Sequence, residues 1–143
     1  MDFTGVIRNS FSNVLLFGEY AGSILGITNF PDNYVIVQSE CVDTEIETDY
    51  FTVYPVQKLD LNYTGKLRDD VWITNEARTI CDMIKDDREF GFIQEAIDEY
   101  IINNEKGVEH YKEVLDVARH YNIESKVMAT IDYAKSHEYY EEN

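Results

Sequence analysis

The sequence predicts an α+β protein, with a small, mostly antiparallel sheet packed with helices and followed by a helical C-terminal half. Before residue 74, β-branched and aromatic residues alternate with polar ones in several short segments, as in half-buried strands. From Asn75 onward, apolar residues recur with the spacing of a helix. Because strands and helices occupy separate parts of the chain, an α+β class is favoured over a doubly wound parallel sheet.

The chain of 143 residues is expected to form a single domain. It is 44% hydrophobic and has only two prolines, and no long linker or repeat divides it. We divide it into a sheet-rich part (1–73), a helical part (74–136) and a frayed, charged tail (137–143).

One helix and several strands are predicted in the sheet-rich part. The helix ends at Gly26, where glycine can adopt the left-handed conformation of a helix C-terminus. An acidic stretch without basic residues, 40–49, is expected to be a solvated edge strand or hairpin arm. The helix and the other strands are expected at Phe17–Leu25, Tyr34–Gln38, Asp49–Val56, Leu59–Tyr63 and Val71–Ile73.

Four helices are predicted in the helical part. The first begins at Asn75, where the apolar spacing changes to that of a helix, with Thr74 as its cap. The second runs from about Arg88 to Asn103 and ends in a polar turn. Two more are expected around residues 111–121 and 127–134, where apolar residues again recur with helical spacing.

The charge of the chain argues against nucleic-acid binding. There are 12 Lys and Arg residues against 28 Asp and Glu residues, a net charge of −16. A surface of this sign repels phosphate backbones, so no direct nucleic-acid contact is expected. With no apolar run long enough for a membrane span and no secretory signal evident, we expect a cytoplasmic protein without membrane contact. Its two cysteines, Cys41 and Cys81, are expected to be free thiols.

The segment from Trp72 to Ile84 is the most informative part of the chain. A short apolar strand leads through Thr74 into a helix in which Glu76 suits the positive N-terminal end. Arg78 and Asp82 are four residues apart on one helix face and can pair. Two roles stay open for this pair: a buried contact that fixes the helix to the sheet, or a contact with a partner.

This segment resembles the "strand, Ser/Thr, Glu-Arg-Thr, apolar pair, Asp" signature of the C-terminal domain of AbiEi-type antitoxins. These proteins are partners of nucleotidyltransferase toxins in bacterial toxin–antitoxin operons. A second similarity lies upstream, where a helix with small residues and a terminal Leu-Gly is followed by a Pro-containing turn and a strand (18–37). Together with the helical tail, the resemblance covers roughly residues 14–136. Here Glu76-Ala77-Arg78 replaces the family's adjacent Glu-Arg.

The resemblance implies an antitoxin that neutralises a nucleotidyltransferase-type toxin without catalysis. Family members usually carry a winged-helix DNA-binding domain before this region, and only about a dozen residues precede it here, so promoter repression is not expected. Neutralisation could be indirect, or the acidic chain could mask a basic, RNA-binding toxin surface. The alternative is a non-catalytic adaptor of the same fold that binds a small ligand or a protein. The sequence does not indicate the oligomeric state.

No catalytic, cofactor-binding or metal-binding residues are predicted. The three histidines lack partners at metal-ligand spacing, and the acidic residues 95, 98 and 99 are expected to be a solvated helix face. The candidate positions for the family motif or a partner contact are therefore Thr74, Glu76, Arg78, Asp82 and Tyr20. Tyr20 is included because tyrosines of the sheet-rich part could form one contact face, together with Tyr34, Tyr50, Tyr54 and Tyr63.

Overall fold

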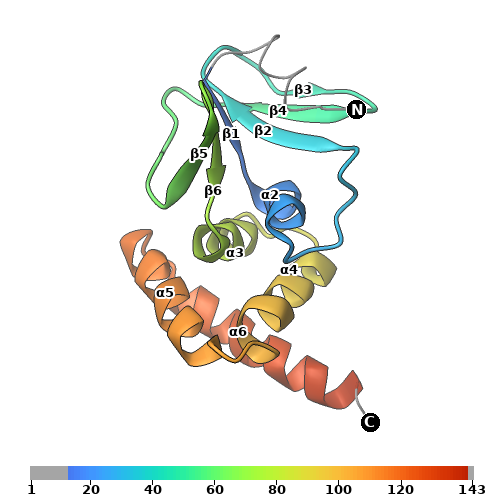
Figure 1. The fold of residues 1–143 in the computed structure, drawn as a ribbon, viewed down its shortest axis with the longest axis vertical. Helices are drawn as coiled ribbons and strands as arrows, with labels where there is room; N and C mark the ends of the chain where they lie inside the picture. The colour runs from blue at the N-terminus through green and yellow to red at the C-terminus, as the bar shows by residue number, and fades with distance from the viewer. Residues whose placement is uncertain (1–12, 142–143) are drawn as a thin grey trace.

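A six-stranded mixed sheet forms one end of the molecule, and a group of helices forms the other (Figure 1). The structure, a computed structural model, describes residues 13–141. The strand order is β3-β4-β2-β1-β6-β5. The strands are β1 (Val14–Leu16), β2 (Val35–Ser39), β3 (Ile46–Glu47), β4 (Phe51–Pro55), β5 (Thr64–Arg68) and β6 (Val71–Thr74).

Three of the neighbouring strand pairs are antiparallel, and two, β1 with β6 and β2 with β4, are parallel. The central strand β1 is buried along its whole length, because it has neighbours on both sides and apolar residues on both faces. The acidic stretch supplies β3, which is two residues long and lies at one edge of the sheet. A short, charged strand of this kind disfavours pairing with other chains.

The helices are α2 (Gly18–Leu25), α3 (Glu76–Lys85), α4 (Phe90–Ile97), α5 (Gly107–His120) and α6 (Glu124–Glu141), with a π-helical turn, η1 (Asp98–Ile102), that continues α4. In Figure 1, α2 and α3 lie next to the sheet, and α4, α5 and α6 lie beyond them. The helix α2 ends at Gly26 in the left-handed conformation, with φ of 81°. This confirms the predicted helix end.

Two apolar clusters make up the core. One joins the inner strands with Phe17, Tyr20 and Ala21. The other joins α3, α4, α5 and α6 and has its centre at the fully buried Ile80, Ile97 and Ile131. The α+β class and the helical C-terminal half are therefore confirmed.

The structure differs from the predicted elements at several places. The strand β1 was not predicted, because three residues are too few to show alternation. Residues 59–63 form a loop instead of a strand, and the strand begins at Thr64, since Asp60 and Asn62 place their carbonyl groups on Arg78. The helix predicted from about Arg88 to Asn103 is present as α4 and η1, which together run from Phe90 to Ile102. The helix α6 continues through residue 141, into the predicted tail, whose last two residues, 142–143, lie outside the described part.

Gly107 allows η1 and α5 to approach each other closely. A Cβ atom at this position would lie 2.1 Å from the backbone oxygen of Ile101, whereas one at Gly91 would meet nothing within 4 Å. We expect Gly107→Ala to lower the free energy of unfolding by about 2–3 kcal/mol. The matched control Gly91→Ala, within α4, should raise it by about 0.5–1 kcal/mol. Urea unfolding of the two variants checks this, and equal effects would contradict the close approach.

Candidate functional site

The helix α3 starts at an asparagine cap. The Oδ1 atom of Asn75 accepts a hydrogen bond from the backbone N–H of Arg78, 2.8 Å away. The predicted cap, Thr74, is instead the last residue of β6 and is fully buried. Its hydroxyl lies 2.6 Å from the hydroxyl of Thr79. Thr74 therefore connects the strand to the first turn of the helix, while Asn75 satisfies the free N–H group.

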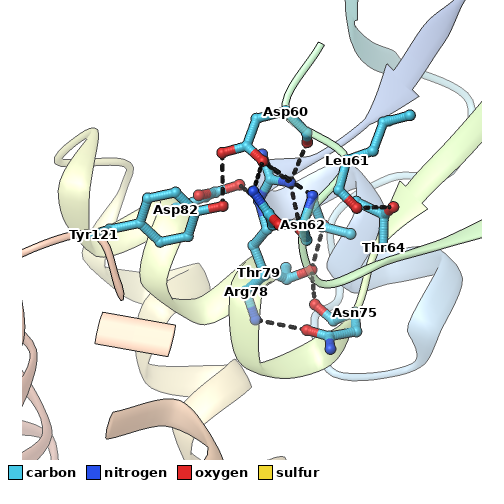
Figure 2. Close-up of polar contacts among 10 residues, drawn as sticks. Asp60, Leu61, Asn62, Thr64, Asn75, Arg78, Thr79, Asp82 and Tyr121 are labelled. Atoms are coloured by element: carbon cyan, nitrogen blue, oxygen red, sulfur yellow. Dashed lines mark hydrogen bonds and ion pairs between the residues drawn. The ribbon is translucent and has the colours of Figure 1, made fainter. Parts of the chain in front are cut away.

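Arg78 is the centre of a polar network between the sheet and α3 (Figure 2). Its side chain is only 5% exposed. One terminal nitrogen, Nη1, donates to the carbonyl oxygens of Asp60 and Asn62, and Nε donates to Oδ2 of Asp82, 3.2 Å away. The guanidinium group of Arg78 thus fixes α3 to a loop that lies eighteen residues earlier in the chain.

The network extends to the end of α5 through Asp60. The hydroxyl of Tyr121, the residue directly after α5, donates to Oδ2 of Asp60 at 2.7 Å. Burial raises the pKa of Asp60, but hydrogen bonds from Asn62 and Tyr121 and the charge of Arg78 outweigh burial, so that the pKa is lowered overall. Asp60 is therefore a carboxylate near neutral pH and can accept from both sides of the network.

The pKa of Asp82 is raised, in contrast to that of Asp60. Burial raises its pKa from the usual 3.8 to about 6, although the positive charge of Arg78 opposes this change. Its side chain is 14% exposed and receives one hydrogen bond from Arg78. The neutral form of Asp82 is therefore favoured more strongly in the folded chain than in the unfolded chain, and ionisation of Asp82 costs folding free energy.

We expect Asp82→Asn to remove part of the pH dependence of stability. Because the folded pKa is raised, the contribution of Asp82 is fully present below its ordinary pKa and is lost as the pH rises through about 6. Between about pH 5 and pH 7.5, wild-type stability should fall by about 1.4 kcal/mol more than that of the variant. Urea unfolding at several pH values measures this difference. The exposed Asp132→Asn serves as a charge-matched control, and parallel pH profiles of wild type and Asp82→Asn would contradict the expectation.

The remaining candidate residues lie outside this network. Glu76 is in the first turn of α3, where its charge suits the helix dipole. Tyr20 is only 2% exposed and packs in the core of the sheet, so it does not present its side chain to a partner. Of the other tyrosines expected in one contact face, Tyr50 is 63% exposed directly before β4, and Tyr63 is 36% exposed directly before β5, a strand at the edge of the sheet.

The network is suited to holding elements together. Each polar group of Arg78, Asp60 and Asp82 described above forms its hydrogen bond with another group of the same chain. The Arg78–Asp82 pair is also buried. The geometry therefore favours the first of the two roles expected for this pair, fixing the helix to the sheet. Within residues 13–136, no group of three or more His, Cys, Asp or Glu side chains is placed to hold a metal ion.

Sequence reasoning missed Asp60, Asn62 and Tyr121. Asp60 and Asn62 belong to a segment interpreted as a strand, and Tyr121 was noted only as the end of a helix expected around residues 111–121. The single available signal was the turn-forming Asp-Leu-Asn sequence at 60–62.

The chain matches no model of a known protein family and no curated protein. Among the described helices, none combines the length and the apolar character needed to cross a membrane.

Proposed function

We propose that this chain is the antitoxin component of a bacterial toxin–antitoxin system and that it neutralises a nucleotidyltransferase-type toxin without catalysis. The observation that carries the proposal concerns residues 72–84, which resemble the AbiEi signature and which we call the AbiEi-like segment. Thr74 and Thr79 share a hydrogen bond between β6 and α3. Arg78 donates to Asp82 and to the carbonyl group of Asn62 in the loop before β5. A signature of this kind is expected where a family must preserve one junction of its fold.

The charge of the chain supports a protein partner over a nucleic acid. With a net charge of −16, the cytoplasmic chain we envisage would attract a basic, RNA-binding toxin and repel RNA itself. Such attraction raises the rate of encounter and weakens with salt. Association at low salt and its loss at high salt are therefore expected for direct masking of the toxin.

Co-expression with the product of the adjacent gene tests the proposal. Host growth is compared with and without this chain, and the two proteins are then tested for co-purification. Rescue together with co-purification is the result expected for direct neutralisation, and rescue alone indicates an antitoxin that opposes the toxin indirectly. If the neighbouring product is not toxic, or its toxicity is not relieved, the antitoxin proposal is wrong.

The second candidate function is that of a non-catalytic adaptor that binds a protein or a small ligand. It is favoured by the exposed aromatic side chains near β5, where Tyr63 and His120 lie 5.4 Å apart. An adaptor would bind a partner without relieving any toxicity, so the same co-expression experiment separates the two functions.

A further inference from the structure

Three aromatic side chains meet where the start of β5 lies against the end of α5. The ring of Tyr63 is 5.4 Å from that of His120 and 6.3 Å from that of Tyr121, and the rings of His120 and Tyr121 are 4.7 Å apart. Tyr63 is 36% exposed, His120 is exposed and Tyr121 is half-buried. We call these three residues the aromatic patch. Accessible Tyr rings are enriched at protein interfaces, because they bury apolar area and keep a polar tip.

The backbone of Tyr63 is strained. Its φ of 57° lies in the left-handed region, and every other residue with positive φ in the described part of the chain is Gly, Asn or Asp. Those residue types tolerate this conformation, whereas an aromatic residue does so at a cost. An Asn at this position would fit the backbone better. The presence of Tyr therefore indicates a use for its ring that stability does not explain.

The polar network described above holds this strained residue in place. The carbonyl group of Tyr63 accepts from the backbone N–H of Asn75 at 2.9 Å, and the carbonyl group of Asn62 accepts from Arg78. Tyr121 is held by Asp60. Two of the three rings in the aromatic patch are thus positioned by the residues of the AbiEi-like segment and their partners.

A cation borders the aromatic patch. The Nζ atom of Lys85 lies 5.8 Å from the ring centre of Tyr121. Among the described residues no ion pair joins this lysine to a carboxylate, although its charge opposes the rise in the pKa of Asp82. In a chain with a net charge of −16, this exposed lysine places a positive charge beside the half-buried ring of Tyr121. It would complement a carboxylate next to an apolar side chain.

We propose that the aromatic patch is the surface through which this chain contacts its partner protein, which would present an apolar side chain flanked by a carboxylate. The proposal rests on the proposed function and specifies the contact surface. The net negative charge favours a protein over a nucleic acid at this surface. The acidic remainder of the chain attracts a basic partner at long range, while Lys85 fixes the orientation of the docked partner through an opposite local charge.

Tyr63→Asn separates binding from stability. Asn tolerates the left-handed backbone, so the melting temperature should stay the same or rise. Because the variant lacks the exposed ring, its affinity for the adjacent-gene product should fall at least about tenfold, and growth rescue should fall with it. Tyr50→Asn is the matched control and should bind like the wild type. Tyr50 is 63% exposed and lies directly before β4, which β2, β1 and β6 separate from β5 in the sheet.

Lys85→Glu provides a second, independent test. It should weaken binding about tenfold or more, whereas Lys112→Glu, which makes the same change of charge at an exposed position on α5, should not. If Tyr63→Asn and Lys85→Glu both bind and rescue like the wild type, the aromatic patch is not the contact surface, although the antitoxin function stands. If the wild-type chain itself gives no rescue, the proposed function is wrong and the contact surface falls with it.

Discussion

Replacing Arg78 with alanine is expected to lower the free energy of unfolding by about 3–5 kcal/mol. The Arg78 side chain is 5% exposed and donates to two backbone carbonyl groups and to Asp82. The substitution leaves these acceptors buried without a donor, and unpaired buried groups account for most of the cost. Urea unfolding measures the change, and a marked drop in melting temperature should accompany it.

Arg119→Ala is the control for this prediction. Arg119 also makes two ion pairs, with Asp116 and Glu124, but its side chain is 56% exposed, so its loss should cost no more than about 1 kcal/mol. Equal costs for the two substitutions would contradict a buried, structural role for Arg78. Growth rescue by Arg78→Ala at a temperature where it remains folded would further separate a structural role from a partner contact.

Arg88→Ala is expected to have the second large effect, about 3 kcal/mol. The Nε atom of Arg88 lies 2.9 and 3.1 Å from the two carboxylate oxygens of Glu19. The Glu19 side chain is 6% exposed, and that of Arg88 is 27% exposed. The hydrogen bonds to Glu19 and Tyr54 raise the pKa of Arg88 against the opposing effect of burial. Without Arg88, the carboxylate of Glu19 would remain buried and unpaired.

The double variant Glu19→Gln/Arg88→Ala tests this explanation. Since the neutral amide costs less to bury than a carboxylate, the double variant should be more stable than Arg88→Ala alone. Urea unfolding of both single variants and the double variant gives the coupling. If the two substitutions are additive, the cost of Arg88→Ala does not come from an isolated buried charge.

The sequence predicted those parts of the fold that have strong local signals. The apolar spacing on α3 and the glycine after α2 were sufficient for both helices. The strand β1 and the loop before β5 were not predictable in this way. The first is three residues long, and the second is held by a residue eighteen positions away, so tertiary contacts override local preference at both.

The candidate site was predictable only in part. Spacing placed Arg78 and Asp82 on one helix face, and the structure joins them at 3.2 Å. Their burial depends on Asp60, Asn62 and Tyr121, which come from other elements, and no periodicity in the sequence reports on such contacts. The aromatic patch could not be predicted from the sequence either. The positive φ of Tyr63 is a property of the folded backbone, which no sequence pattern reveals.

The position of α3 has a consequence for how the chain unfolds. Its apolar residues, among them Ala77, Ile80 and Ile84, belong to the helical core, while Arg78 fastens the same helix to the loop before β5. Neither half can open without exposing a surface of this shared helix. The two halves should therefore lose structure in one concerted step, with backbone amides on both sides of residue 75 exchanging their hydrogens at similar rates.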